Sequence, residues 1–241
     1  MLDNYIKQKV DLVSYSQVEL SNIANTLSYL KNIVNNQPDF REPFLGGSYK
    51  RATMVKGVSD VDVYFKYVGN GNPQSALSVL KNGLMRSYPT TIIKQDKPSI
   101  LVDFLKIPFN ITPYKEDNWG NLSIPDKYLL SWQTMSFGEL EQNIIALRRQ
   151  NSKFIDLIKI LKLWNFNHRK GIKNFEIEKR VCSLYLGRQL YQNSLSEMMI
   201  HFFNNNGYQS DAVKMQLLRN NIHSNSNYNW INFIENRKTY F

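Results

Sequence analysis

The chain has 241 residues, of which 42% are hydrophobic and 13% aromatic, and it carries a net charge of +10. This length is sufficient for a two-lobed enzyme with a substantial buried core. The single cysteine, Cys182, excludes an internal disulfide and any multi-cysteine metal site, which fits a reducing compartment.

Targeting and membrane-spanning patterns are absent from the sequence. Residues 1–5 are not a basic segment followed by an apolar run, and the chain has no run of about 18 apolar residues, the length that a membrane span needs. We therefore expect a soluble, cytoplasmic protein without a membrane partner.

The first predicted element is a helix over residues 16–35. Ser16 and Glu19 form a capping-box pattern at its start. A Gly46-Gly47-Ser48 turn follows, in which glycine lets the backbone approach a ligand closely and serine offers a hydroxyl and an N–H to phosphate oxygens. The turn predicts a phosphate site, with an ordinary turn serine as the alternative.

Three acidic residues lie in strand-like runs. Side chains alternate along a strand that rises about 3.3 Å per residue, so Asp60 and Asp62 are expected on one face, roughly 6–7 Å apart. Asp103 lies in a second such run, residues 100–107. Three carboxylates together suit Mg²⁺, although the first two could cap an edge strand and Asp103 could pair with Lys50 or Arg51.

The rest of the first half predicts a small mixed sheet backed by helices. A loop over residues 69–73 ends in an N-cap and an N1 proline, and a helix follows to about Tyr88. Strands are expected over residues 90–94 and 100–107. Residues 108–135 show no sustained period, so we interpret them as a connector.

Helical periodicity dominates the second half, beginning with a capping-box pattern at Ser136–Glu139. Asn-rich residues 204–206 and 220–229 are interpreted as loops or a loosely ordered tail. These patterns predict an α+β fold with a catalytic lobe over residues 1–125 and an all-α lobe over residues 126–241. The expected helices cover residues 139–149, 153–166, 175–191, 195–203 and 211–221.

The positive charge is regional. Residues 148–180 contain ten Lys and Arg against three Asp and Glu. Such a region could bind RNA, neutralise nucleoside triphosphates or be a solvated helix face. We favour free nucleotides, because no aromatic-interleaved basic stretch accompanies the charges. His168, His201 and His223 lack metal-ligand spacing and receive no role.

The chain contains, in order, the segments Gly47-Ser48, Lys50-Arg51-Ala52-Thr53, Ser59-Asp60-Val61-Asp62 and Val102-Asp103, followed by Ile124-Pro125, Ser131-Trp132, Ile158–Trp164 and Asn174–Glu178. With these segments the sequence resembles the DNA polymerase beta superfamily of nucleotidyltransferases, and within it the bacterial cGAS/DncV-like cyclic-oligonucleotide synthases. The similarity extends over about residues 1–190. One position departs from the family pattern, since Ala52 stands where the family usually has glycine.

This resemblance implies two lobes with the active site in the cleft and two Mg²⁺ or Mn²⁺ ions. Asp60 and Asp62 would bind both metals, and Asp103 would complete the site and help to deprotonate the attacking ribose hydroxyl. Lys162, or else Lys159, would reach the triphosphate from the second lobe. The other implied substrate-binding residues are Gly47, Ser48, Lys50, Arg51 and Thr53.

The implied function is the joining of nucleoside triphosphates, such as ATP or GTP, into a cyclic di- or oligonucleotide second messenger in anti-phage defence signalling. One alternative is template-independent addition of nucleotides to an RNA 3′ end, of the tRNA CCA or poly(A) type, which the basic region 148–180 would favour. Another is a catalytically idle nucleotide- or RNA-binding protein on the same scaffold.

Overall fold

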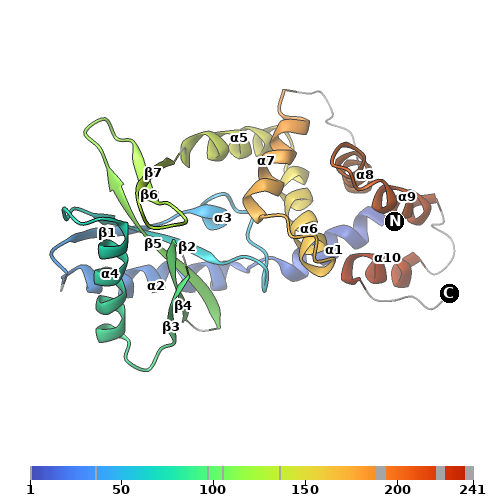
Figure 1. Cartoon of the computed structure of the whole chain (residues 1–241). Coiled ribbons are helices and arrows are strands. Elements are labelled where there is room, and N and C mark those ends of the chain that lie inside the picture. Colours follow the sequence, from blue (N-terminus) through green and yellow to red (C-terminus); the bar gives the residue numbers. More distant parts are fainter. Residues whose placement is uncertain are drawn as a thin grey trace. The chain divides into compact units, whose positions relative to one another are not determined.

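The computed structural model describes residues 2–35, 37–96, 98–104, 106–135, 137–187, 194–220 and 226–236. Helices and strands in these ranges form two compact units (Figure 1). The helical unit comprises Met1–Ser14, Thr53–Val58 and Leu140–Phe241. The sheet unit comprises Tyr15–Ala52 and Ser59–Glu139.

This division differs from the expected boundary between residues 125 and 126. Helix α1 (Leu2–Val13) packs against helices of the helical unit, because its apolar stripe of Leu2, Ile6 and Val10 is buried there. Residues 126–139 remain with the sheet unit, since strand β7 (Trp132–Met135) extends its sheet.

A mixed sheet organises the sheet unit, as the sequence predicts. Its main path has the order β1-β2-β5-β4-β3; β6 pairs with β5, and β7 pairs with β6. Strands β2 and β5 are parallel, and the other pairs are antiparallel. The remaining strands are β1 (Phe40–Leu45), β2 (Val61–Tyr67), β3 (Ile93–Asp96), β4 (Ser99–Phe104), β5 (Ile107–Glu116) and β6 (Leu122–Pro125).

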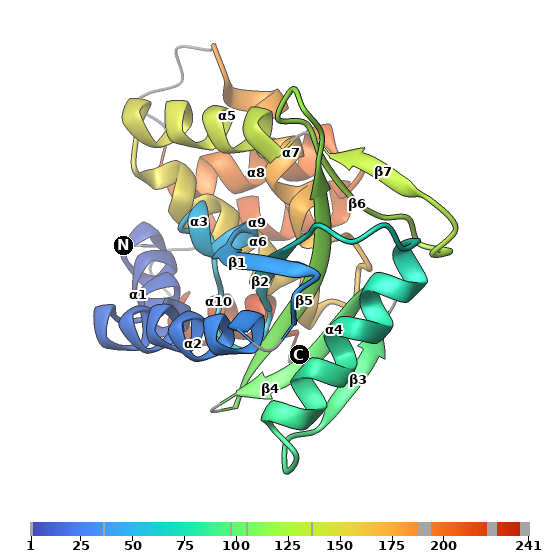
Figure 2. The ribbon, with the colours of Figure 1, turned by 90° about the vertical axis from the view of Figure 1, so that its left-hand side faces the viewer.

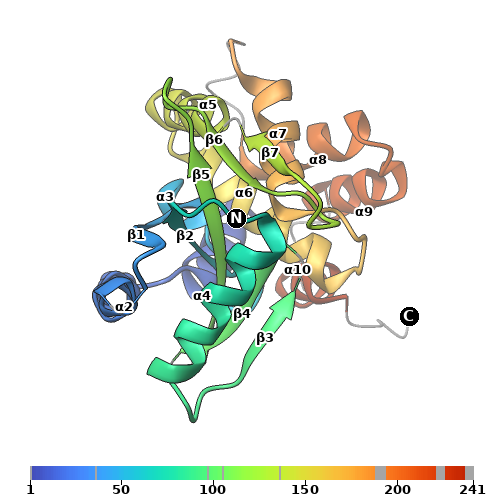
Figure 3. The ribbon, with the colours of Figure 1, turned by 60° about the vertical axis from the view of Figure 1, so that its left-hand side comes forward.

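Two longer helices support this sheet, and both begin with the predicted caps. Helix α2 (Gln17–Asn35) starts with reciprocal Ser16–Glu19 hydrogen bonds and packs against β1 (Figure 3). Helix α4 (Pro73–Ser87) starts with Asn72 Oδ1 accepting from the Ser75 N–H at 2.8 Å. It lies along β3, β4 and β5 (Figure 2). These contacts confirm the capping predictions.

The two faces of the sheet differ in polarity. Alternate residues of β2, β5 and β4 are fully buried and apolar. The register places Asp62, Asn110 and Leu101 side by side on the opposite face, and Asp103 two residues further along β4. Because paired residues on neighbouring strands share a face, the predicted acidic residues of β2 and β4 point to one side of the sheet. The buried set is Val61, Val63, Phe65, Phe109, Ile111, Ile100 and Val102.

The predicted connector over residues 108–135 is wrong. This segment holds most of β5 together with β6 and β7. Pro108 and Pro113 interrupt the apolar alternation, yet β5 accommodates both. Pro108 lies at its start, and Pro113 lies beyond the β4 pairing, which ends at Ile111.

Seven helices of the described chain belong mainly to the helical unit, which is all-α as predicted. Most of these helices end close to the expected positions, but α7 ends at Tyr185, six residues before the expected end. Ser136, the predicted N-cap, and residues 188–193 lie outside the described residues. Besides α1, they are α5 (Phe137–Gln150), α6 (Lys153–Asn167), α7 (Asn174–Tyr185), α8 (Leu195–Asn205), α9 (Gln209–Asn220) and α10 (Ser226–Glu235).

Helix α10 contradicts the prediction of a loop over residues 220–229, and α8 likewise continues to Asn205. Trp230, Phe233 and Ile234 are buried in the core of the helical unit, at the i, i+3, i+4 spacing of a helix face. Burial of this face outweighs the weak helix propensity of the asparagines. Across the described residues, no helix is both long and apolar enough to span a bilayer.

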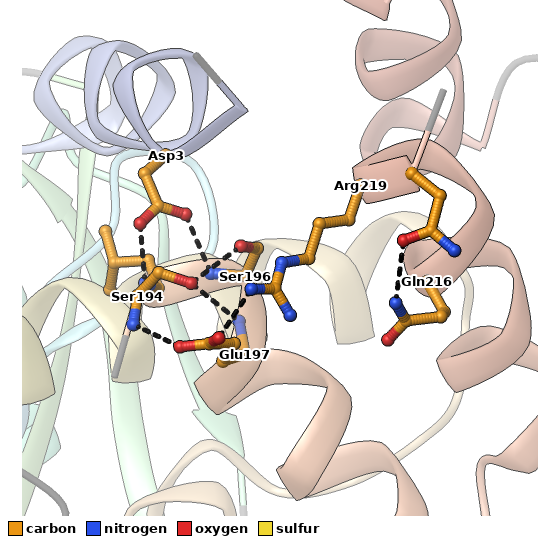
Figure 4. A network of polar contacts seen from close by, with 8 residues as sticks. Asp3, Ser194, Ser196, Glu197, Gln216 and Arg219 are labelled. Atoms are coloured by element: carbon orange, nitrogen blue, oxygen red, sulfur yellow. Dashed lines mark hydrogen bonds and ion pairs between the residues drawn. The ribbon is translucent and has the colours of Figure 1, made fainter. Parts of the chain in front are cut away.

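A polar network joins α1 to α8 (Figure 4). The Asp3 carboxylate accepts hydrogen bonds from the backbone N–H groups of Leu195 and Ser196 at 3.1 and 3.0 Å. Ser194 and Glu197 add a reciprocal capping box, and Arg219 pairs with Glu197. A carboxylate at a helix N-terminus is stabilising, so the network fixes α1 to the start of α8.

A buried ion pair lies within the helical unit. Lys162 of α6 and Glu178 of α7 have fully buried side chains, with 2.6 Å between Nζ and Oε1. The Lys162 ammonium also donates to the backbone carbonyl of Thr53 at 3.0 Å, and the Thr53 hydroxyl bonds to Glu178. These interactions anchor the start of Thr53–Val58 to two helices.

Replacing Lys162 by Met is expected to lower the free energy of unfolding by about 3–5 kcal/mol, because Glu178 would remain buried without its cation. The double variant Lys162→Met/Glu178→Leu should recover much of this loss. Urea unfolding followed by circular dichroism measures both effects. The control is Arg180→Met, which removes a partly exposed pair with Glu176 on the same helix and should cost under about 1 kcal/mol. Equal losses in the two single variants would contradict the prediction.

Candidate functional site

The glycine turn lies directly on strand β2. The backbone N–H of Gly46 donates to the carbonyl of Asp62 at 2.9 Å. A Cβ atom at residue 46 would lie 2.6 Å from the Tyr64 ring, so the close approach requires glycine. The predicted phosphate turn and the predicted acidic strand are therefore in contact.

Gly47 faces the carboxylate of Asp62. Its φ is +55°, a left-handed conformation that favours glycine. A Cβ atom there would lie 1.7 Å from Asp62 Oδ2, a distance at which the two atoms would overlap. Any side chain at residue 47 would thus displace the carboxylate, whatever its chemistry.

Gly47 is the first residue of the short helix α3 (Gly47–Lys50). Ser48 is buried, Lys50 is exposed, and Arg51 is half-buried at the C-cap, where its N–H donates to the Gly47 carbonyl at 3.3 Å. These three residues therefore lie next to the Gly47–Asp62 contact. Their roles as substrate ligands stay predictions.

Ala52 takes a left-handed backbone conformation with φ +59°. A Cβ atom in this region costs roughly 1–2 kcal/mol, which glycine avoids. The departure from the family pattern thus lies at a position where the backbone favours glycine. The turn retains this conformation in spite of the strain.

Asp62 has a polar neighbour on β5. The parallel register pairs Asp62 with Asn110, and the amide Nδ2 donates to Asp62 Oδ1 at 3.5 Å, a long hydrogen bond. Sequence reasoning missed Asn110, because the segment was interpreted as a connector. Its only signal was an asparagine between Phe109 and Ile111 in an apolar run.

Asp60 immediately precedes β2. The residue is exposed overall, yet partial desolvation of its carboxyl raises the pKa of Asp60, and the negative charge of Asp96 raises it further. A divalent cation beside this carboxylate would oppose both effects, because it favours the ionised form.

Asp103 lies away from the other two acids. It is exposed on β4, and β5 separates β4 from β2. Two strand spacings correspond to about 10 Å between backbones. Within the described ranges, no three His, Cys, Asp or Glu residues are grouped closely enough to hold a metal ion. The structure therefore brings Asp62 together with Gly47 and Asn110, and not with Asp103.

The donors near the turn suit a hard divalent cation. Asp60 and Asp62 offer carboxylate oxygens and Asn110 offers an amide oxygen, all of which are ligand types that Mg²⁺ accepts. Such a site would leave coordination positions for water or substrate phosphates, as Mg²⁺ sites usually do. The donor set therefore fits the predicted cation.

Two of the predicted substrate ligands, Thr53 and Lys162, make buried interactions within the helical unit. Thr53 and Lys162 are fully buried within the helical unit, bonded to each other and to Glu178, so neither side chain is accessible to a triphosphate. Lys159 is half-buried, and its ammonium donates to Ser14 Oγ at 3.0 Å. Burial lowers the pKa of Lys159. A substrate-binding role for Lys159 stays a prediction.

Comparison with protein families finds one matching family model. The Second Messenger Oligonucleotide or Dinucleotide Synthetase domain matches residues 1–145, which include the turn, both acids of the β2 region and Asn110. No curated protein sequence matches the chain.

Solved structures with the same fold are similar to most of the chain. Escherichia coli MS115-1 CdnC with ATP has a TM-score of 0.68 at 20% identity, covering 84% of this chain and 70% of that one. Bradyrhizobium diazoefficiens CdnG, a CD-NTase in complex with GTP, has a TM-score of 0.68 at 12% identity, with coverage of 84% and 75%. The STING-associated CdnE c-di-GMP synthase of Capnocytophaga granulosa has a TM-score of 0.64 at 14% identity, with coverage of 94% and 81%. At these identities the similarity shows a shared fold.

Replacing Gly47 by Ala is expected to destabilise the protein by about 2–5 kcal/mol, from left-handed strain and overlap with the Asp62 carboxylate. Gly57→Ala is the matched control, because Gly57 has φ +71° but no atom within 4 Å of an added Cβ. Strain alone should cost that variant about 1–2 kcal/mol. Denaturant unfolding measures both.

A double-mutant cycle isolates the contact itself. If the overlap is responsible, Gly47→Ala should cost less in an Asp62→Ala background than in the wild type, because the carboxylate is gone. Additive losses would show that Gly47 matters only for its backbone conformation.

Proposed function

Since the chain belongs to the family of second messenger oligonucleotide or dinucleotide synthetases, we propose that it joins nucleoside triphosphates into a cyclic di- or oligonucleotide with release of pyrophosphate. The observation that carries the proposal is the contact of the Asp62 carboxylate with Gly47, which supports a cation site beside a phosphate-binding turn. Both residues lie within the matched region.

Each residue of the turn has a part in this proposal. Gly47 admits the phosphate chain close to the backbone, and Ser48 donates to its oxygens. Each nucleoside triphosphate brings about four negative charges, and Lys50 and Arg51 balance part of this charge. CdnC and CdnG are known with ATP and GTP, which supports nucleoside triphosphates as substrates here.

Asp60 and Asp62 hold the divalent cations in this proposal. When bound, Mg²⁺ or Mn²⁺ lowers the pKa of the attacking ribose hydroxyl and stabilises charge on the pyrophosphate. The raised pKa of Asp60 gives the site a proton-sensitive member, because a protonated carboxyl is a poor metal ligand. Activity is therefore expected to fall as the pH falls towards the pKa of Asp60.

We further propose that the product acts as a second messenger in the cytoplasm, in anti-phage defence. Membership of the family supports this setting. Base choice depends on the side chains that contact the bases.

The test is incubation of the purified chain with ATP, GTP, CTP and UTP and with Mg²⁺ or Mn²⁺. A phosphatase-resistant product with the mass of a cyclic oligonucleotide is expected, with stoichiometric pyrophosphate. Asp62→Asn should reduce pyrophosphate release by about 1,000-fold or more, because the removed cation ligand supplies several kcal/mol of transition-state stabilisation. Asp117→Asn, at an exposed loop of the sheet unit, is the control and should retain wild-type activity.

Three outcomes would contradict the proposal. Extension of labelled tRNA without any cyclic product would indicate RNA 3′-end addition. Binding of ATP without pyrophosphate under any condition would indicate a catalytically idle protein. Equal activity of Asp62→Asn and wild type would remove Asp62 from the site.

A further inference from the structure

We propose that Asn110, and not Asp103, is the third member of the site, where its side-chain amide positions the Asp62 carboxylate. The inference rests on the proposed function, because it concerns the same cation and nucleotide site. The site would then contain two carboxylates and one neutral amide in place of the three carboxylates that the sequence predicts.

The sheet register provides the first argument. Asp62 and Asn110 are direct partners on the parallel strands β2 and β5, so their backbones are about 4.8 Å apart and their side chains share a face. Asp103 pairs with Pro108 on the far side of β5, about 10 Å from β2. Asn110 therefore occupies the nearest position from which a neighbouring strand can reach Asp62.

The surroundings of the two carboxylate oxygens provide the second argument. Asp62 Oδ1 accepts from the Asn110 amide, while Oδ2 lies over the Cα of Gly47. The carboxylate is thus bounded on two sides, which restricts its rotation. A positioned carboxylate binds a cation with a smaller loss of side-chain entropy than a freely rotating one.

The side-chain environment of Asp103 gives the third argument. Asp103 is exposed, whereas both Asp62 and Asn110 are half-buried. A carboxylate in open solvent is strongly screened and contributes little field to a site about 10 Å away. At this distance Asp103 is therefore not expected to share a cation with Asp62.

The neutral charge of the amide has a consequence for cation binding. Two carboxylates attract a divalent cation less strongly than three, so the site should bind a free cation weakly. A nucleoside triphosphate brings additional oxygen ligands and negative charge, as in other Mg²⁺ sites. Cations are thus expected to occupy the site mainly together with the nucleotide.

The experiment titrates Mn²⁺ into the whole chain and measures bound and free ion by electron paramagnetic resonance. Wild type, Asn110→Ala, Asn110→Asp and Asp103→Asn are compared without nucleotide and with a non-hydrolysable ATP analogue. Thermal unfolding of each variant confirms folding. Asn110→Asp is nearly isosteric, which guards against loss of the fold in Asn110→Ala.

We expect Asn110→Asp to raise the affinity for Mn²⁺ alone by about tenfold, because it adds a carboxylate beside Asp62. Asn110→Ala should lower the Mn²⁺ affinity of the nucleotide complex by about tenfold, the usual effect of losing a residue that orients a ligand. Asp103→Asn should stay within about twofold of wild type. In pyrophosphate assays, Asn110→Ala should raise the Mn²⁺ concentration needed for half-maximal rate, and saturating Mn²⁺ should restore part of the rate.

The inference is overturned if Asp103→Asn weakens Mn²⁺ binding about tenfold, or if both Asn110 variants bind Mn²⁺ like wild type. The proposed function is judged separately by Asp62→Asn and by product formation. If Asp62→Asn loses Mn²⁺ binding while both Asn110 variants bind Mn²⁺ like the wild type, the proposed function is kept and this inference is rejected. If the wild type forms no product but the Asn110 variants change Mn²⁺ binding as expected, the proposed function is rejected and this inference is kept.

Discussion

The contact between Asp62 and Gly47 is the constraint on which the candidate site depends. The carboxylate occupies the space that a side chain at residue 47 would need, so Asp62 can keep this position only with glycine at residue 47. The hydrogen bond from the Gly46 N–H to the Asp62 carbonyl holds the turn against β2 at the same point. A cation bound by Asp62 and a phosphate bound by the turn must therefore be neighbours, and this proximity is what nucleotidyl transfer needs.

The segment that joins the turn to β2 is anchored in the helical unit. Lys162 donates to the carbonyl of Thr53, and Asn174 donates to that of Val58 at 3.2 Å. Between these ends, the Lys56 N–H donates to the Val13 carbonyl at 2.8 Å. The segment continues directly into the turn at one end and into the Asp60 strand at the other. The buried ion pair of Lys162 is thus linked to the candidate site through the chain itself, although its side chain is fully buried in the helical unit.

The sequence predicted the parts of the site that depend on local pattern. The glycine turn, the Asp60–Asp62 spacing and the caps of α2 and α4 are properties of short segments. Strand β5 was missed because Pro108, Asn110 and Pro113 break its alternation, and its position follows only from pairing with β2 and β4. The buried ion pair of Lys162 was not predicted, because helical periodicity does not reveal a partner 16 residues away. Asn110 could be recognised only from the register, since one asparagine carries no motif.

The positive charge of residues 148–180 is partly satisfied inside the helical unit. Burial lowers the pKa of Lys159, so its ammonium loses its proton more easily than an exposed one. A paired ammonium attracts a polyanion less than a free one, so counting charges along the sequence overstates the field available to RNA. The structure therefore weakens the electrostatic reason for an RNA surface and leaves the case for nucleotides to the turn and its acids. The paired cations of this region are Lys162 with Glu178, Lys170 with Asp211 and Arg180 with Glu176.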